Sequence, residues 1–280
     1  MKKELFTTKK KINKTKIGII ADIHYYEKYK QKILDSLLNQ IKEEQPNYFV
    51  VAGDILDRAN NKYDRLLNFL NDISKICPVI MILGNHDTYR RVKGKVVEDK
   101  CTNFINDISN NENIYLLEDN NYLDNNINFY GFHFPSFHYY KDKERYGSFI
   151  KYLGNIHPKL NDKNYNIVLF HSPVNIYKYI ERNPDSNLAK ADLIISGHMH
   201  NGCIPYTITN IFNRLFKTNR SLISPEKTLF PKYSQGRVYK IRDGIIYEGV
   251  SKLSVSTGIL HRFDCIYHKQ VKFIEIENEE

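Results

Sequence analysis

Two histidines at the end of an apolar run are the first residues in this sequence whose types and spacing could do metal chemistry. His198 and His200 stand one residue apart in the stretch ISGHMHNG (195–202), directly after a glycine. Imidazole is a common ligand of transition metals, but two such residues could equally lie on the surface at the tip of a strand. The metal hypothesis therefore requires matching ligands elsewhere in the chain.

Matching residues follow four other apolar runs. Each run ends in Asp, Asn or His, and five of the chain's 10 histidines lie in these places. The residues at the five run ends are Asp22-Ile23-His24, Gly53-Asp54 with Asp57 and Arg58 beyond, Gly84-Asn85-His86-Asp87, His171, and Gly197-His198-Met199-His200. Ligands of open α/β sheets bind outside the carboxyl ends of the strands, so we expect these side chains to meet.

The donor types indicate which ions would bind. Carboxylate, imidazole and amide oxygen without thiolate suit Mn, Fe, Zn, Co or Ni. Two divalent cations about 3.5–4 Å apart need a bridging carboxylate with further donors on each side. We expect the glycines before Asp54, Asn85 and His198 to allow sharp chain reversals that aim these ligands at one centre.

The elements that must position these residues follow from the hydrophobic pattern. Apolar runs at 16–22, 48–54 and 78–87 alternate with helical patterns at 33–41 and 66–73. Continuous apolar runs joined by helices are typical of βαβ units whose sheet is buried on both faces. The rest of the pattern predicts strands at 113–117, 127–132, 165–173 and 191–200, helices at 96–111, 141–154 and 174–182, and antiparallel strands at 237–241, 244–249, 253–258 and 271–276.

Charge and length bound the domain organisation. The chain has 280 residues and a net charge of +9, and its first sixteen residues hold seven lysines and one glutamate. No linker is long enough to divide the chain, so we expect a basic flexible arm at 1–15 and a single domain at 16–280. A positive surface attracts anions such as phosphate esters, nucleic acid or an anionic membrane.

Targeting and redox signals point to the cytoplasm. The sequence has no apolar run of 18 residues and no apolar stretch behind the N-terminal lysines, so we expect neither a membrane span nor a signal peptide. The four cysteines, Cys77, Cys101, Cys203 and Cys265, are far apart and form no C-x-x-C pair. They are typical of reduced thiols in a cytoplasmic protein.

Taken together, the motifs resemble the calcineurin-like metallophosphoesterase superfamily. The series D-x-H, G-D-x-x-D-R, G-N-H-D, H and G-H-x-H runs from residue 22 to residue 200 in the family's order, with none missing. The segment LFPKYSQGRV (229–238) is also similar to the bacterial branch that includes membrane-associated phosphoesterases. The resemblance implies a four-layer α/β/β/α sandwich of two mixed sheets, with a dinuclear metal site at the carboxyl ends of the strands.

The resemblance also implies a role for each site residue. Asp22, His24 and His200 would hold one metal ion, Asn85, His171 and His198 the other, and Asp54 would bridge them. Manganese is favoured over iron and zinc for the two ions. A hydroxide that bridges them would attack phosphorus. His86 would be a catalytic residue that binds no metal and stabilises the transition state or protonates the leaving oxygen, and Asp87 would orient it.

The predicted activity is hydrolysis of a phosphodiester, pyrophosphate or monoester in a small or lipid-linked substrate. A nuclease of the same fold is the main alternative, favoured only by the net charge of +9. A phosphoprotein phosphatase would resemble the chain less, since it carries G-N-H-E where this chain has G-N-H-D. A non-catalytic scaffold is expected to have substituted ligands, and here all seven are intact.

Residues outside the ligand set could contact the substrate. Arg90 and Arg91 follow G-N-H-D and could bind phosphate, or could form a solvated basic loop. His133 at another strand end could line the site or be structural. The segment 201–240 mixes apolar and cationic residues, so we expect it to form a wall of the pocket that favours diesters or pyrophosphates with a bulky or lipid-like group. The same mixture predicts a peripheral contact with an anionic membrane at its inner face.

Overall fold

The computed structural model describes most of the two sheets and the helices beside them. The described residues are 4–26, 31–56, 62–92, 95–98, 101–133, 150–156, 158–171, 176, 179–180, 183–197, 238–241, 244–248 and 271–279. For Glu4 and for residues 89–92, 95–98, 238–241 and 244–248, the backbone alone is described.

The first sheet has six strands and brings both ends of the chain together. Its order is β1 (Glu4–Thr8), β14 (Lys272–Asn278), β2 (Thr15–Ile20), β3 (Tyr48–Ala52), β4 (Val79–Ile82) and β7 (Ile114–Leu116). Strands β2, β3, β4 and β7 are parallel, whereas β14 pairs antiparallel with β2 and parallel with β1. All five residues of β3 are buried, as expected for the continuous apolar run that forms this central strand.

The second sheet is also mixed. Its order is β12 (Val238–Ile241), β13 (Gly244–Glu248), β11 (Leu193–Ser196), β10 (Tyr165–Leu169), β9 (Ile127–Gly131) and β8 (Asn120–Asp124). The four inner strands are parallel and the two edge strands are antiparallel to their neighbours. A separate two-stranded ribbon is formed by β5 (Tyr89–Val92) and β6 (Lys95–Glu98).

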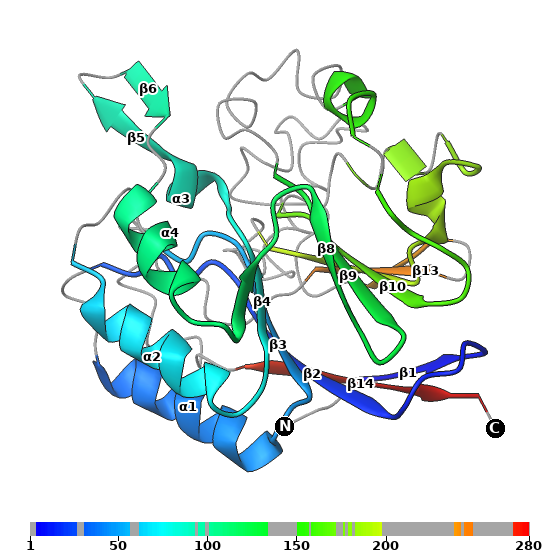
Figure 1. Cartoon of the computed structure of the whole chain (residues 1–280), viewed down its shortest axis with the longest axis horizontal. Coiled ribbons are helices and arrows are strands. Elements are labelled where there is room, and N and C mark those ends of the chain that lie inside the picture. Colours follow the sequence, from blue (N-terminus) through cyan, green and yellow to red (C-terminus); the bar gives the residue numbers. More distant parts are fainter. Residues whose placement is uncertain are drawn as a thin grey trace, which may run out of the picture.

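Three helices cover the outer face of the first sheet: α1 (Gln31–Glu44), α2 (Asp64–Ser74) and α4 (Thr102–Ser109) (Figure 1). Leu34, Leu37 and Ile41 lie on one side of α1 and are buried, which is the spacing of an amphipathic helix. The single turn α3 (Asn85–Thr88) follows β4, and the 3₁₀ turn η2 (Asn187–Lys190) precedes β11. In the predicted helices 141–154 and 174–182, the described residues 150–153, 176 and 179–180 are helical.

The two sheets face each other across a shared apolar core. Ile19 and Val50 of the first sheet belong to the same buried cluster as Phe129 and Ile167 of the second. Another cluster, which includes Phe170, lies on the opposite face of the second sheet. The predicted α/β class with two mixed sheets is therefore confirmed, while a fourth, helical layer stays a prediction.

The N-terminal segment differs from the predicted flexible arm. Residues Glu4–Thr8 form β1 and pair with β14 along their whole length, and the Phe6 side chain is buried. Lysines of the segment are held by acidic partners: Lys10 Nζ lies 2.5 Å from Asp192 Oδ2, and Lys14 Nζ lies 2.9 Å from Glu277 Oε2. The lysine-rich composition concealed alternating residues that face the core, so Glu4–Thr8 of the predicted arm belong to the sheet.

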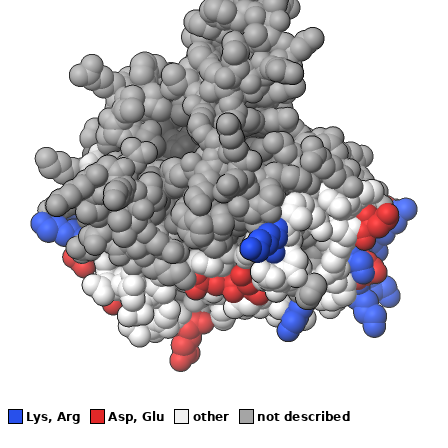
Figure 2. All heavy atoms as spheres, turned by 90° about the horizontal axis from the view of Figure 1, so that it is seen from above, with Lys and Arg blue, Asp and Glu red and all other residues white. Residues whose placement is uncertain are grey.

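On the face shown in Figure 2, described Lys and Arg side chains stand at separate places, several of them beside Asp or Glu. The described helices include none with both the length and the apolar character needed to cross a membrane.

Because β1 is part of the first sheet, we predict different losses of stability for substitutions at Phe6 and at Leu5. Phe6→Ala should lower the free energy of unfolding by about 3 kcal/mol, because it removes a buried aromatic ring. Leu5→Ala is the matched control, since Leu5 is 57% exposed, and its effect should be below about 0.5 kcal/mol. Urea denaturation followed by circular dichroism measures both. Equal, near-zero effects would show that the segment behaves as a flexible arm in solution.

Candidate metal centre

The loops that follow β2 and β3 are joined by main-chain hydrogen bonds. Asp22 N donates to Gly53 O at 2.9 Å, and His24 N donates to Asp54 O at 3.0 Å. Tyr25 N then donates to Ile55 O at 2.8 Å. Parallel pairing therefore continues beyond the strands, and it fixes Asp22, His24 and Asp54 relative to one another.

These loops hold an unusual backbone conformation. Asp22, His24 and Asp54 have φ angles of 55°, 46° and 52°, and Gly53 has 88°. Left-handed backbone is sparsely populated by residues with a side chain, costs on the order of 1–3 kcal/mol each, and clusters at functional sites. The hydrogen bonds between the loops maintain this conformation, which turns the side chains across the strand ends.

Asp87 ties the third loop to the second. Its Oδ1 accepts a hydrogen bond from Leu56 N and its Oδ2 accepts one from Gly84 N, both at 2.8 Å. The Asp87 side chain is fully buried. It therefore positions the one-turn helix α3, which carries Asn85 and His86, against the loop that carries Asp54.

The Asp54 carboxylate lies at the centre of the site. Its Oδ2 is 3.2 Å from Nε2 of His171 and 3.8 Å from Nε2 of His24. Its Oδ1 accepts a hydrogen bond of 2.7 Å from the backbone N–H of His86. The rings of His24 and His86 meet edge to face with 4.5 Å between centroids.

The main chain orients His171. Its Nδ1 lies 2.8 Å from the Ala52 carbonyl oxygen and donates to it, which directs Nε2 toward Asp54. The sequence gives no signal for this contact, because a carbonyl acceptor belongs to every residue type.

Two groups of side chains could each hold a cation. One consists of Asp22, Asp54 and His171, and the other of His24, Asp54 and His86; within each group the ligand atoms lie within 4.8 Å of one another. Carboxylate and imidazole donors without thiolate suit a borderline divalent metal. Asp54 belongs to both groups, as a bridging carboxylate would.

The two groups compare with the predicted ligand sets as follows. Asn85 is buried at the start of α3, in the same loop as His86. The structure groups Asp22 with His171, which were predicted to serve different ions, and places His86 beside His24. The assignment of each ligand to one ion and of His86 as a residue that binds no metal stays a prediction.

The electric field of the site favours cations. Burial by itself would raise the pKa of Asp54, but the charges of His171, His86 and His24 hold it well below its usual value. Burial would lower the pKa of His171, yet Asp54 and then Asp22 raise it to about 9. Burial, followed by the Asp54 charge, raises the pKa of Asp87 to about 7. Ionised Asp54 draws a proton onto His171, and a divalent cation would satisfy the same negative potential.

The three glycines before the ligands act in two different ways. Gly53 has the positive φ that a chain reversal requires. At Gly84, a Cβ atom would lie 2.2 Å from Asp54 Oδ1, and at Gly197 it would lie 2.9 Å from Asp22 Oδ2. The prediction of a chain reversal is thus right for Gly53. Gly84 is needed because the Asp54 carboxylate passes directly against it, and Gly197 because Ala21 and Ala52 crowd it as closely as Asp22 does.

Several predicted site residues lie outside what the structure describes. Asp57, Arg58, His198 and His200 are outside the described residues, as are 201–237 of the predicted pocket wall. Arg90 and Arg91 lie in β5, where the backbone alone is described. The structure therefore brings together Asp22, His24, Asp54, Asn85, His86, Asp87 and His171.

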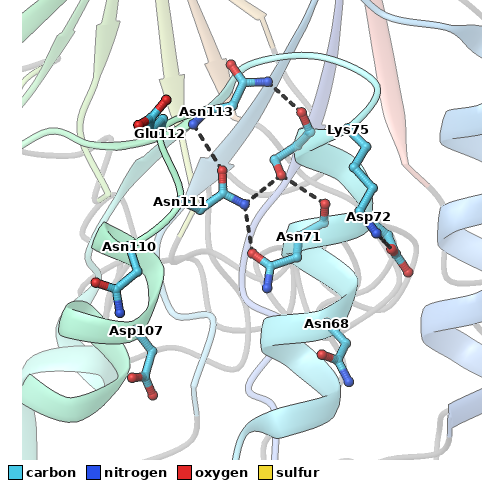
Figure 3. Close-up of a pocket in the computed structure, with 10 residues that line it drawn as sticks. Asn68, Asn71, Asp72, Lys75, Asp107, Asn110, Asn111, Glu112 and Asn113 are labelled. Carbon is cyan, nitrogen blue, oxygen red and sulfur yellow. Dashed lines mark hydrogen bonds and ion pairs between the residues drawn. The ribbon is translucent and has the colours of Figure 1, made fainter.

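A groove elsewhere on the molecule holds none of these residues. It has a volume of about 830 Å³ and runs between α2 and α4 (Figure 3). Asn111 Nδ2 donates to Asn71 Oδ1 and to Ser74 Oγ, both at 2.8 Å. These bonds fasten α2 to the turn that follows α4.

Two sheets with Asp and His side chains gathered at their carboxyl edge define an α/β protein with a metal-binding site. The model of the calcineurin-like phosphoesterase family matches residues 15–202, which is more than half of the chain. The chain belongs to the calcineurin-like phosphoesterase family. This confirms the resemblance inferred from the motifs.

Individual relatives are distant. An uncharacterised metallophosphoesterase of Campylobacter jejuni is 27% identical over 198 residues, which cover 68% of this chain and 45% of that protein. The chain thus spans less than half the length of this relative. Among solved structures, the protein TT1561 of Thermus thermophilus has a TM-score of 0.47 and 8% identity, covering 87% of this chain and 92% of its own. Phosphopantetheinyl hydrolase of Mycobacterium tuberculosis has a TM-score of 0.44 and 9% identity, covering 85% and 89%.

The close approach at Gly84 predicts the effect of a single methyl group. Gly84→Ala should displace the Asp54 carboxylate and reduce the manganese bound per chain at least about tenfold, as expected for the loss of more than 1.4 kcal/mol of binding energy. Gly154→Ala is the control, because a Cβ there would meet its nearest neighbour at 3.4 Å. Mass spectrometry of metals in dialysed protein gives the content, and circular dichroism checks the fold. A folded Gly84→Ala protein with full metal content would contradict the placing of Asp54.

Proposed function

We propose that this protein hydrolyses phosphoric esters with two divalent metal ions held at the edge where the two sheets meet. The observation that carries the proposal is the buried Asp54 carboxylate, which is shared by both candidate ligand groups. Family membership supports hydrolysis of a phosphoester in general. Two bound divalent ions lower the pKa of water to about 7 and neutralise charge on phosphoryl oxygens.

The protein's own residues would divide the remaining tasks. Asp54 would bridge the ions, with Asp22, His24 and His200 on one of them and Asn85, His171 and His198 on the other. Among Asp22, His24, Asp54, Asn85, His86 and His171, all are buried except His86, which is partly exposed. This exposure supports the proposal that His86 contacts the substrate and protonates the leaving oxygen.

The proposed substrate is a phosphodiester or pyrophosphate with a bulky or lipid-like group. This finer statement depends on segment 201–240 and on Arg90 and Arg91, whose cationic side chains suit an anionic substrate. Contact of the segment with the inner face of an anionic membrane belongs to the same proposal. Hydrolysis of single-stranded DNA in preference to small diesters would favour the nuclease instead.

The first test of the proposal is metal removal. Protein loaded with Mn²⁺ should hydrolyse bis(p-nitrophenyl) phosphate, and dialysis against EDTA should abolish turnover until Mn²⁺ is restored. Mn²⁺ at about 100 times its Kd should also stabilise the fold by about 2.7 kcal/mol, which thermal unfolding measures. Turnover that survives chelation would reject the metal-dependent activity. Parallel loading with Fe²⁺ and Zn²⁺ tests the preference for manganese.

The roles of His86 and Asp54 are separated by comparing metal content with turnover. His86→Ala should leave metal content near normal while turnover falls by about a hundredfold, as expected for loss of a general acid. Asp54→Asn should lower both together, because the bridging charge is lost. Since His86 lies beside His24 and Asp54, a His86→Ala protein that lost one metal ion would identify His86 as a ligand.

A further inference from the structure

A second carboxylate–imidazole pair lies at the same edge of the sheets as the candidate metal centre. Nδ1 of His133 is 2.9 Å from Oε1 of Glu118, with the two side chains 21% and 34% exposed. His133 follows β9, and Glu118 lies where the chain passes from β7 in the first sheet to β8 in the second. Neither residue of this pair is among those proposed for hydrolysis.

The pairing of β9 with β10 places His133 next to His171 in the sheet. Gly131 pairs with Leu169, and the N–H of Phe132 donates to Leu169 O at 3.0 Å. His133 and His171 each follow two residues after the Gly131–Leu169 pair. Adjacent parallel strands are about 4.8 Å apart, so the two histidines lie at neighbouring strand ends on the same edge of the sheet.

Contacts across the sheets agree with this placing. A Cβ atom at Gly131 would lie 2.8 Å from Ile82 at the end of β4, which leads into the loop that carries Asn85. The ring of His133 lies against Glu118 in the connection between the two sheets, as the ring of His171 lies against Asp54. The two sheets therefore present two carboxylate–imidazole pairs in a row, Asp54–His171 and Glu118–His133.

Asp119 binds the main chain at His133, whereas Glu118 binds its ring. Its backbone N–H donates to Asp119 Oδ1 at 2.8 Å, and the hydroxyl of Tyr152 donates to the same oxygen. With Nδ1 bound to Glu118, Nε2 has no hydrogen-bond partner within the described part of the chain. The His133 side chain is 21% exposed, and Nε2 of a neutral imidazole can accept a hydrogen bond from a ligand hydroxyl.

We infer that His133, positioned by Glu118, binds a hydroxyl group on the organic part of the substrate. This inference rests on the proposed function, since it takes the phosphoryl group to be bound at the adjacent metal centre. His133 is one strand farther along the edge than His171, so it reaches the substituent rather than the phosphorus. The substrate class is a phosphodiester or pyrophosphate whose organic part carries a free hydroxyl group, as a glycerol or sugar unit does.

Binding of two matched ligands tests the inference. Glycerol 3-phosphate and propyl phosphate differ only in two hydroxyl groups, and calorimetry on the Mn²⁺-loaded chain gives the Kd of each. The wild-type protein should bind glycerol 3-phosphate about tenfold more tightly, which corresponds to one good hydrogen bond. His133→Ala should remove this preference without changing the Kd of propyl phosphate more than about twofold, the size of a minor structural effect.

Two further variants distinguish contact with the ligand from support of the fold. His133→Asn retains a donor for Glu118 but lacks the atom that would reach the ligand, so it should lose the preference as His133→Ala does. Tyr152→Phe is the control, because it removes the neighbouring hydrogen bond to Asp119 and leaves the imidazole in place. A His133→Asn protein with the wild-type preference, or a Tyr152→Phe protein without it, would overturn the inference.

The outcome is separable from that of the proposed function. A wild-type protein that hydrolyses bis(p-nitrophenyl) phosphate but binds the two ligands equally well would refute the role of His133 alone. A protein that prefers glycerol 3-phosphate through His133 yet hydrolyses no ester would refute the proposed activity alone. Failure to bind either ligand would refute the role of His133.

Discussion

The buried charge of Asp54 is the constraint on which the rest of the site depends. A carboxylate that is 1% exposed cannot be solvated by bulk water, so its charge must be met by protein groups or a cation. In this fold, the groups around it are the imidazoles of His171 and His24 and the backbone N–H of His86. Each comes from a different strand end, so satisfying one charge requires three loops to converge.

That convergence explains the backbone around the site. Asp22, His24 and Asp54 adopt left-handed conformations, and the main-chain bonds between their loops hold them there. Gly84 then leaves room for the Asp54 carboxylate. Strain and close packing at these positions are consistent with a site shaped for a ligand rather than for stability alone.

The apolar core makes such a site possible. Helices on one face of the first sheet and the second sheet on the other bury nearly every side chain of β2, β3 and β4. Rigid strands fix where each loop begins, so small loops can carry the ligands accurately. The same rigidity brings Glu118 and His133, which are not part of any motif, to the edge that carries Asp54 and His171.

Much of the central fold could be read from the chain because it depends on local pattern. The continuous apolar runs at β2, β3, β4, β10 and β11 and the helical spacing of α1 and α2 predicted the parallel strands and their covering helices. The polar strand β8, with the sequence NNYLD, had no such pattern, because it lies at the edge of its sheet. The lysines on either side of β1 concealed that strand in the sequence.

For the site, the sequence by itself determined which residue types stand at the carboxyl ends of the strands, and parallel strands necessarily bring such ends to one edge. Tertiary structure alone decided that His171 bonds to Ala52, that Gly84 is needed for space, and that Glu118 meets His133. These contacts depend on the register between strands and on the packing of one sheet against the other. They join residues that are far apart in the chain, and no local sequence pattern shows which distant residues will meet.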